Sequence, residues 1–518
     1  MIRTDLIASV GALLQRHADQ RPQKNAFEDS RGQSITYAQL ARDTGALAVE
    51  FQNRGIEAQD RIALLLTNSV DWVLSCLATV RAGAVCVPIS HEAVEGEIRY
   101  RLEDAACKAI VVSPQQLPLI QRIQGDFPGL KLVIVADEQA HPGTQPLGAL
   151  VRSGVLGTPR DSADINALSF LVYTSGTTGR AKGVMLSQHS MLWVTAACWA
   201  PIAGLCESDV VLSPLPLYHS YALNLSVLSI VAAGATEYLQ EKFSTQETLR
   251  LLHSGRFSLM PGVPTMFHYL LEASKASGMQ KIPGIRYFVS AGAILPAALN
   301  QEFEAAFQVP LLDGYGITET STMVTMNWPG SARVMGSCGL PLPGLAVRIV
   351  NLDGQDVALG EEGELIVRGP NVMLGYLNKP EDTAAALRGG WYRTGDLARS
   401  DANGFLTITG RLKELIIRGG QNIAPAEVED AVLRHPDVLD CAAIGMPHPH
   451  LGEVPVVCVI AREGRTLNAD VLREHCAGLL SAYKVPQQIH VVTNIPRTGS
   501  GKIMRFQLRA ALSAEAAS

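Results

Sequence analysis

The sequence predicts an α/β protein with a large N-terminal domain of helix-covered sheets, a small antiparallel β subdomain and a small α+β C-terminal domain. Three observations lead to this prediction. Short runs of Val, Ile and Leu alternate with helix-length segments through the first 300 residues, as parallel strands covered by helices do. From about residue 335 the strand-like runs are separated by Gly and Pro turns roughly every ten residues. A further α/β segment begins near residue 414.

The individual elements follow from the apolar pattern. Residues 1–23 have apolar side chains at helical spacing, and Asp5, Arg16 and His17 interrupt any signal-peptide core, so we expect the first helix of the fold there. We expect strands at residues 61–68, 85–90, 108–113, 131–137, 438–446 and 453–461, and further helices at residues 70–83 and 424–436.

Composition and charge exclude several classes of protein. The chain has 518 residues, of which 47% are hydrophobic and 18% charged, as in ordinary soluble globular proteins. A net charge of −6, from 43 basic and 49 acidic residues, offers no cationic surface for nucleic acid. No apolar stretch is long enough to span a membrane, and the nine cysteines contain no CxxC pair. We therefore expect a cytoplasmic protein with reduced cysteines.

One loop, "SFLVYTSGTTGRAKGVML" at 169–186, has the residues of a phosphate cradle. Glycines allow successive backbone N–H groups to converge on an anion, Ser175, Thr177 and Thr178 add hydroxyl donors, and Lys182 adds a point charge. A P-loop would need GxxxxGK[ST] running directly from a strand into a helix. Here two residues separate Gly179 from Lys182, and a strand follows the lysine. A Gly/Thr hairpin without a ligand remains the alternative reading of this loop taken alone.

Five motifs in a fixed order decide between these readings. They are "YTSGTTGRAKG", "DGYGITET" at 313–320, "YRTGDL" at 392–397, "GRLKELIIRGGQNIAPAEVE" at 410–429 and "PRTGSGK" at 496–502. Together they resemble the adenylate-forming superfamily of acyl-CoA synthetases, peptide-synthetase adenylation domains and firefly luciferase. The resemblance covers residues 20 to 510, and the chain is most similar to a free-standing acyl-CoA synthetase.

The resemblance implies a two-step reaction. A carboxylate attacks the α-phosphorus of ATP to give an acyl-adenylate and pyrophosphate, and a thiol then displaces AMP. ATP, Mg²⁺ and coenzyme A are the implied cofactor and co-substrates. The first step brings two anions together, so Lys, Arg, Mg²⁺ and backbone amides are the groups to expect. The implied domains are 1–410, with the β subdomain at about 335–410, and a mobile C-terminal domain at 411–518.

Several ATP-binding positions also make chemical sense by themselves. Gly314 and Gly316 permit a tight backbone beside Tyr315, whose ring can stack on a base, and Asp396 can accept hydrogen bonds from two ribose hydroxyls. The resemblance assigns to ATP and AMP the residues Thr174, Ser175, Gly176, Thr177, Thr178, Gly179, Lys182, Gly292, Ala293, Asp313, Gly314, Tyr315, Gly316, Thr318, Asp396, Arg411 and Lys502. Position 181 is often Pro in the family and is Ala here.

The catalytic residues implied by the resemblance are Lys502, Thr174, Glu319 and His219. Lys502 would bridge the substrate carboxylate and the α-phosphate, and Glu319, a hard oxygen ligand, would bind Mg²⁺. The family has an aromatic residue or His near position 219 that gates the acid pocket, and a core histidine is the equally weighted alternative for His219. His435, His448 and His450 lack the spacing of a metal site.

The second step would use another face of the C-terminal domain. Lys413 occupies the family's hinge position, and rotation there would remove Lys502 from the active site. The loop of Arg418, Gly419 and Gly420 would then approach the pantetheine arm of coenzyme A.

We expect an apolar acid, either a medium- or long-chain fatty acid or an aryl acid. The segments 218–224, 261–265, 290–294 and 314–323 should line the acid pocket, and their only charged residue is Glu319, which is assigned to the metal. The amino-acid-activating members have an Asp early in the stretch corresponding to "SYALN", which is absent here. The expected pocket residues are His219, Tyr221, Ala222, Gly262, Ala291, Gly316 and Met323.

Other functions remain as alternatives to a CoA ligase. The chain ends 16 residues after Lys502, so we expect a free-standing enzyme, and an acyl-AMP ligase that loads a separate acyl-carrier protein is the second reading. A luciferase-like oxidoreductase would use the same adenylate with oxygen, and a kinase would release ADP instead of AMP. An ATP-binding sensor could lose Lys502 and Glu319, which are both present. The sequence leaves open whether the protein is a monomer or a homodimer.

Overall fold

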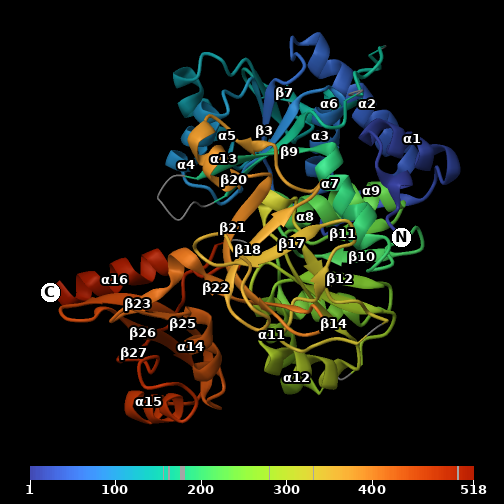
Figure 1. The fold of residues 1–518 in the computed structure, drawn as a ribbon. Helices are drawn as coiled ribbons and strands as arrows, with labels where there is room; N and C mark the ends of the chain where they lie inside the picture. Colours follow the sequence, from blue (N-terminus) through green and yellow to red (C-terminus); the bar gives the residue numbers. More distant parts are fainter. Residues whose placement is uncertain are drawn as a thin grey trace.

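The computed structural model describes residues 1–139, 141–155, 157–161, 164–174, 181–278, 281–330, 332–498 and 501–517. Figure 1 shows a large body that contains two sheets, in blue to yellow, with an orange antiparallel sheet beside them. A red C-terminal domain protrudes from this body.

The first large sheet has nine strands in the order β16-β15-β14-β13-β12-β10-β11-β1-β2. The six strands from β14 to β1 are parallel, and β2, β15 and β16 pair antiparallel at the edges. The strands are β1 (Asn25–Asp29), β2 (Ser34–Thr36), β10 (Val210–Ser213), β11 (Thr236–Leu239), β12 (Leu259–Gly262), β13 (Tyr287–Ser290), β14 (Leu311–Tyr315), β15 (Thr325–Met326) and β16 (Leu340–Pro341).

The second large sheet has eight strands in the order β19-β9-β8-β4-β3-β5-β6-β7. The strands from β8 to β7 are parallel, whereas β8, β9 and β19 pair antiparallel. The strands are β3 (Arg61–Leu65), β4 (Val85–Pro88), β5 (Ala109–Val112), β6 (Leu132–Val135), β7 (Gln145–Pro146), β8 (Leu168–Thr174), β9 (Lys182–Ser187) and β19 (Gly375–Tyr376).

Helices fill the space between the two sheets and cover their outer faces. The central core joins apolar side chains of both sheets to those of α1 (Val10–Gln20), α2 (Tyr37–Asn53), α3 (Val70–Arg81), α6 (Leu147–Val151), α7 (Gln188–Val194), α8 (Ser220–Ala222) and α9 (Ile230–Ala233). The outer helices are α4 (Glu95–Asp104) and α5 (Leu117–Ile123) on the eight-stranded sheet, and α10 (Thr245–Leu252), α11 (Pro264–Ser277) and α12 (Ala297–Phe307) on the nine-stranded sheet. The fold therefore has alternating layers of helix and sheet, as the apolar strand pattern predicts.

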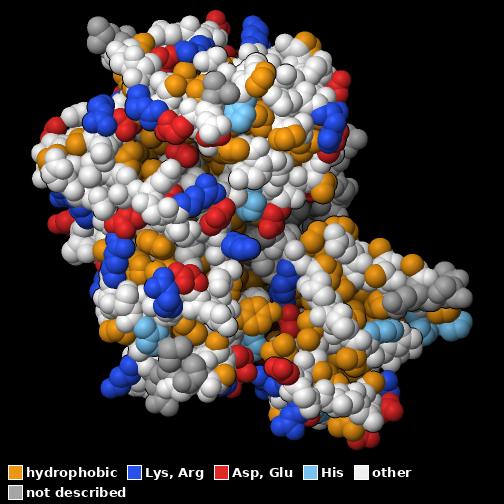
Figure 2. Space-filling model, turned by 180° about the vertical axis from the view of Figure 1, so that it is seen from behind, with side chains coloured by type: hydrophobic (Ala, Val, Ile, Leu, Met, Phe, Trp, Pro, Cys, Tyr) orange, Lys and Arg blue, Asp and Glu red, His pale blue; other side chains and the backbone are white. Residues whose placement is uncertain are grey.

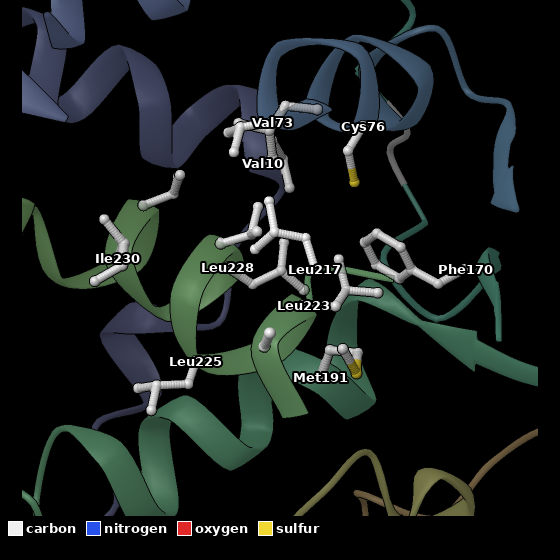
Figure 3. Close-up of a cluster of buried hydrophobic side chains, with 14 of the residues drawn as sticks. Val10, Val73, Cys76, Phe170, Met191, Leu217, Leu223, Leu225, Leu228 and Ile230 are labelled. Carbon is white, nitrogen blue, oxygen red and sulfur yellow. The ribbon is translucent and has the colours of Figure 1, made fainter. Parts of the chain in front are cut away.

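The central core includes two π-helical segments, Thr195–Trp199 and Leu223–Ser229. Figure 3 shows Leu223 and Leu228 of the second segment below Val10 and Val73, with Met191 and Phe170 alongside. The buried Asn224 joins the two segments, because its side-chain oxygen accepts a hydrogen bond from Trp199 Nε1 at 2.7 Å. This packing fixes the segment that directly follows His219.

The β subdomain is an antiparallel sheet in the order β17-β18-β21-β20, with β22 paired to β21. The strands are β17 (Ala346–Val350), β18 (Gly363–Arg368), β20 (Leu387–Arg388), β21 (Trp391–Ser400) and β22 (Leu406–Arg411), and α13 (Pro380–Ala386) lies between β19 and β20. This sheet begins later than residue 335, because β16 pairs with β15 and extends the nine-stranded sheet.

The C-terminal domain has a sheet in the order β24-β23-β26-β25, with β27 paired to β26. One face of this sheet packs against α14 and α15, and the other packs against α16. The elements are β23 (Ile416–Arg418), β24 (Gln421–Ile423), α14 (Pro425–Leu433), β25 (Val438–His448), β26 (Gly452–Ala461), α15 (Ala469–Ala477), β27 (Gln488–Val491) and α16 (Arg505–Ala517). A short 3₁₀ turn, Leu412–Glu414, connects this domain to β22.

The expected elements agree with this fold in type and differ at their ends. The first helix is α1, and the expected strands at 61–68 and 85–90 are the shorter β3 and β4. Among the described residues no helix is both long and apolar enough to span a bilayer.

Candidate functional site

A large cleft separates the C-terminal domain from the rest of the molecule. Figure 2 shows the C-terminal domain standing apart across a hollow whose two walls have basic and acidic side chains. The wall of the large body includes the end of β14, the segment after β13 and the N-terminal turn of α11, and the opposite wall includes Lys502. All five sequence motifs therefore contribute described residues to one cleft, among them Ala181, Asp313, Gly314, Tyr315, Gly316, Ile317, Asp396, Gly410, Arg411, Lys413, Glu414, Thr498, Gly501 and Lys502.

Asp396 joins two other predicted nucleotide-binding residues in the cleft. Its Oδ2 accepts a hydrogen bond from the Tyr315 hydroxyl at 2.5 Å, and its Oδ1 lies 2.9 Å from Arg411 Nε. The Asp396 side chain is only 4% exposed, whereas the Arg411 side chain is 36% exposed. Burial and the neighbouring Asp396 carboxylate raise the pKa of the Tyr315 phenol, so the phenol stays protonated and donates. This network fixes the plane of the Tyr315 ring in the cleft.

Lys502 lies in the cleft on a short loop before α16. The hydroxyl of Thr498 accepts a hydrogen bond from the Lys502 backbone N–H at 3.1 Å, and the Thr498 N–H donates to the Lys502 carbonyl at 2.8 Å. Burial and then the Arg411 guanidinium lower the pKa of Lys502, whereas the carboxylates of Asp396, Glu319 and Glu414 oppose this shift. Lys502 is therefore a partly buried lysine whose charge interacts with groups from both sides of the cleft.

The Lys502 loop lies directly against the large domain. Gly501 has a φ of +82°, and a Cβ atom at this position would be 3.1 Å from Val263 Cγ2. Glycine suits both the left-handed backbone and the close approach. The loop is also held from its own domain, because Arg497 Nη1 donates to the Gly501 carbonyl at 2.9 Å and Nη2 contacts Asp440 at 2.8 Å.

The predicted phosphate hairpin connects β8 and β9. Thr174 pairs with Lys182 across the two strands, and a strand follows the lysine as the sequence predicts. Ser175, Gly176, Thr177, Thr178 and Gly179 lie outside the described residues. Directly before β9, the Ala181 carbonyl accepts a hydrogen bond from the Tyr100 hydroxyl of α4 at 2.8 Å. Lys182 Nζ lies 3.0 Å from Asp382 Oδ2 of α13.

Glu319 lies on a 3₁₀ turn, Thr318–Thr320, after β14. Its Oε1 accepts a hydrogen bond from the Tyr376 hydroxyl at 3.0 Å, and its carbonyl accepts one from the Met373 N–H at 2.8 Å. No Lys, Arg or His among the described residues forms an ion pair with this carboxylate. The Glu319 charge is therefore available to a cation from outside the chain.

His219 is the N-cap residue of α8 and lies next to the same region. Its neighbour Ser220 hydrogen-bonds the Thr318 hydroxyl at 3.0 Å, which ties this helix to the turn that holds Glu319. Burial and the Lys502 ammonium lower the pKa of His219 to about 3. The imidazole is therefore neutral at physiological pH.

The "DGYG" segment has little free space around its backbone. A Cβ atom on Gly316 would lie 1.2 Å from the carbonyl oxygen of Thr322, so only glycine fits there. The Asp313 carboxyl is buried, its Oδ1 has no hydrogen-bond partner among the described residues, and burial raises its pKa. Asp313 therefore presents a polar group to the cleft that the protein itself leaves unpaired.

Comparison with known proteins identifies the family. The family described as AMP-binding enzyme matches residues 14–377, and its C-terminal domain, described as AMP-binding enzyme C-terminal domain, matches residues 427–502. The chain belongs to the AMP-binding enzyme family.

Three relatives show how closely this AMP-binding enzyme follows other members. An indoleacetate–CoA ligase of Aromatoleum aromaticum is 33% identical over 498 residues, which are 96% of each chain. A sulfoacetate–CoA ligase of Cupriavidus necator is 32% identical over 508 residues, which are 97% of this chain and 98% of the relative. The crystal structure of an anthranilate CoA ligase in complex with anthranoyl-AMP is similar over 100% of both chains, with a TM-score of 0.91 and 27% identity. The protein is an AMP-forming acid–CoA ligase, which works through an acyl-adenylate.

The expected acid-pocket residues of this ligase lie mostly behind the cleft wall. Gly316 lines the cleft. The other six expected residues do not, and these are His219, Tyr221, Ala222, Gly262, Ala291 and Met323. Tyr221, Ala222, Ala291 and Met323 are each at most 5% exposed. The Tyr221 ring stacks on Trp199 with centroids 6.1 Å apart, and its hydroxyl donates to the Val289 carbonyl at 3.2 Å.

The residues expected to bind coenzyme A do not line the cleft either. Arg418, Gly419 and Gly420 connect β23 to β24 on the C-terminal domain, and Arg418 Nη1 donates to the Tyr483 carbonyl at 2.6 Å. Lys413 lies in the turn between β22 and β23 and does line the cleft. In this arrangement of the ligase, Lys502 faces the large domain and the Arg418 loop does not.

Sequence reasoning missed one residue that contacts two of the predicted ones. The hydroxyl of Tyr376, on β19, donates a hydrogen bond to Glu319, and the Lys182 ammonium lies over the Tyr376 ring. The only local signal is the dipeptide "GY" before "LNKPED", and none of the five motifs includes it. Only the pairing of β19 with β9 places this tyrosine at the site.

Proposed function

We propose that this ligase activates an apolar carboxylic acid, either a medium- or long-chain fatty acid or an aryl acid, with ATP and Mg²⁺ and transfers the acyl group to coenzyme A. The observation that carries the proposal is the convergence of Lys502 with Tyr315, Asp396 and Arg411 at one cleft. Lys502 and Arg411 supply positive charge, Tyr315 supplies an aromatic face, and Asp396 supplies a hydrogen-bond acceptor. These are the groups that binding of ATP and a carboxylate requires.

In the first step, the chain must hold two anions together and stabilise the charge that develops at the α-phosphate. Lys502 would contact both the substrate carboxylate and the α-phosphate. Lys182 and the hairpin from Thr174 would hold the β- and γ-phosphates. Tyr315 would stack on adenine, and Asp396 would accept hydrogen bonds from the ribose hydroxyls. A carboxylate has about four acceptor sites, so Asp396 can still accept from the ribose beside its two protein partners.

The described residues fit a magnesium ion that is bound mainly by the nucleotide. Among them no group of three or more His, Cys, Asp and Glu side chains could hold a metal ion. Mg²⁺ at phosphate sites commonly uses one or two carboxylates together with phosphate oxygens and waters, and Glu319 offers one such carboxylate without a cationic partner. Bound there, Mg²⁺ would neutralise charge on the leaving pyrophosphate. Glu319 would orient it.

In the second step, we propose that the C-terminal domain, residues 411–518, rotates about Lys413 relative to residues 1–410. Rotation would take Lys502 out of the cleft and bring Arg418, Gly419 and Gly420 to the pantetheine arm. The sharp turn at Leu412–Glu414, with β strands on both sides, supports a hinge at this point.

The proposal of an apolar acid depends on the residues behind the cleft wall. Tyr221, Ala222, Ala291 and Met323 present apolar surface, and the Tyr221 hydroxyl already has a partner. A charged substituent buried there would have no counter-ion, which is costly. The relatives named above act on acids of different polarity, so the family by itself does not select the acid.

The test is the release of AMP and pyrophosphate from ATP across a panel of fatty, benzoic, arylacetic and cinnamic acids, with sulfoacetate and malonate as charged comparisons. Thioester formation is followed with coenzyme A and with an acyl-carrier protein. We expect apolar acids to be activated and the thioester to form on coenzyme A. Preference for a charged acid would refute the acid assignment, and release of ADP would refute the reaction.

The role of Lys502 is tested by separating the two steps. Lys502→Ala should lose acid-dependent exchange of pyrophosphate into ATP but still form thioester from a supplied acyl-adenylate. Lys281→Ala, which changes an exposed lysine of the same chain, is the matched control and should keep both steps. Full adenylation by Lys502→Ala would contradict the assignment.

A further inference from the structure

We propose that Tyr376 is a positioning residue for adenylation, which couples the phosphate-binding lysine, Lys182, to the metal-binding carboxylate, Glu319. This inference rests on the proposed function and adds a residue to the same site. Tyr376 comes from β19, which pairs with β9 at the edge of the eight-stranded sheet, and is 8% exposed.

Tyr376 makes a different contact with each of the two residues. Its hydroxyl donates to Glu319 Oε1 at 3.0 Å. Lys182 Nζ lies 5.0 Å from the centroid of its ring, which is within the range of a cation–π contact. One rigid side chain therefore sets the distance between a cation and an anion that lie more than 100 residues apart in the sequence, on β9 and on the 3₁₀ turn after β14.

The backbone around Tyr376 is held from both sides, so the side chain has little freedom. Tyr376 pairs with Val184 of β9 in an antiparallel ladder, and its N–H donates to the Thr383 hydroxyl at 2.9 Å. The Met373 N–H donates to the Glu319 carbonyl at 2.8 Å. In Figure 1 the orange helix α13, which contains Thr383, lies among the blue and teal elements of the eight-stranded sheet. The segment 373–377 is thus attached to both partners of Tyr376.

The charges at the site indicate what Tyr376 contributes before the nucleotide binds. Lys182 also contacts Asp382, which is 44% exposed, so a triphosphate can replace this surface carboxylate as the partner of the lysine. The ring of Tyr376 stays beneath Lys182 during such an exchange. Its hydroxyl holds Glu319 at one oxygen and leaves the other oxygen for Mg²⁺. Partners of this kind, which orient a metal ligand, typically change metal affinity 10- to 100-fold when they are removed.

The two contacts can be removed separately. Tyr376→Phe keeps the ring and deletes the hydroxyl, whereas Tyr376→Leu deletes both. Tyr37→Phe is the matched control, because it deletes a buried hydroxyl whose hydrogen is shared between the carbonyls of Ile230 and Ala235, at 3.0 and 2.7 Å, away from the cleft.

The measurement is calorimetric binding of α,β-methylene-ATP, which resists cleavage between its α- and β-phosphates, in EDTA and in Mg²⁺. We expect Tyr376→Phe to bind the analogue in EDTA with an affinity within twofold of the unchanged protein. The gain in affinity that Mg²⁺ provides, which is the ratio of the affinities in Mg²⁺ and in EDTA, should be about tenfold smaller. Tyr376→Leu should lose that gain and also bind about two- to fivefold more weakly in EDTA. In a Glu319→Gln background, Tyr376→Phe should have no further effect on the gain.

The outcomes separate this proposal from the proposed function. If the unchanged protein does not bind the analogue, the proposed function fails. If the unchanged protein binds the analogue but Tyr376→Phe keeps the full Mg²⁺ gain, the positioning role is overturned. An equal loss of affinity in EDTA and in Mg²⁺, which a structural role would predict, also overturns it. Equal behaviour of Tyr37→Phe and Tyr376→Phe would overturn it too.

Discussion

An ion pair between the two domains gives a direct test of domain rotation. Arg462, which follows β26 in the C-terminal domain, contacts Glu272 of α11 in the large domain at 2.5 Å. The rotation that we propose would break this pair when it takes Lys502 out of the cleft. Replacing Arg462 with Gln should therefore weaken this arrangement and, with it, adenylation.

The expected magnitude follows from exposure. The Arg462 and Glu272 side chains are 34% and 30% exposed, so the pair belongs with surface ion pairs, which contribute up to about 1 kcal/mol. A loss of about 0.5 to 1 kcal/mol changes an equilibrium about two- to fivefold. Glu272 retains Lys275 as a partner at 3.1 Å, so Arg462→Gln leaves no unpaired carboxylate. The effect should shrink in 0.5 M salt, because exposed charges are screened.

The assay compares the two half-reactions. Arg462→Gln should lower pyrophosphate exchange about two- to fivefold and leave thioester formation from a supplied acyl-adenylate unchanged or faster. Glu272→Gln should act in the same direction, and the double variant should show less than the sum of the two effects. Arg348→Gln, which removes an ion pair with Asp356 within the β subdomain, is the matched control. Equal losses in both half-reactions, or additive effects of the two variants, would refute the reasoning.

Three further predictions concern the cleft. The Glu414 carboxylate raises the pKa of Lys502, so Glu414→Gln should move the alkaline fall of pyrophosphate exchange, where the ammonium is lost, to lower pH; a shift to higher pH contradicts this. His219, with its pKa lowered to about 3, should keep a constant imidazole NMR shift from pH 8 to pH 5, and a titration near 6.5 would show that it is solvated. Gly316→Ala should destabilise the protein by more than about 3 kcal/mol in denaturant unfolding, because its Cβ would overlap the Thr322 carbonyl, and wild-type stability would exclude this strain.

The sequence predicted those parts of the fold that local patterns encode. Apolar strands alternating with helices predicted the two covered sheets, and the change to short strands with turns predicted the antiparallel sheet. The start of that sheet was predicted too early. The strand Leu340–Pro341 pairs with β15 instead, and strand pairing depends on partners distant in sequence, which local spacing does not reveal.

The site could be predicted in part. The ordered motifs rich in Gly, Thr and charged residues predicted roles for Lys502, Asp396 and Tyr315, and the structure places all three at one cleft. The acid pocket could not be derived in the same way. Tyr221 and Met323 occur in the expected segments, yet their exposure is decided by packing against Trp199 and the rest of the central core.

The sequence by itself determined the class of this protein, an AMP-forming acid–CoA ligase, and it predicted a phosphate hairpin, a metal-binding carboxylate and a catalytic lysine near the end of the chain. The tertiary structure alone decided which of these groups meet. It brings Lys502 close enough to His219, Arg411 and Asp396 for their charges to interact, and it inserts Tyr376 between Lys182 and Glu319. The physical reason is that strand pairing and domain packing set distances between residues that lie far apart in the chain, whereas a motif fixes only the spacing of its own residues.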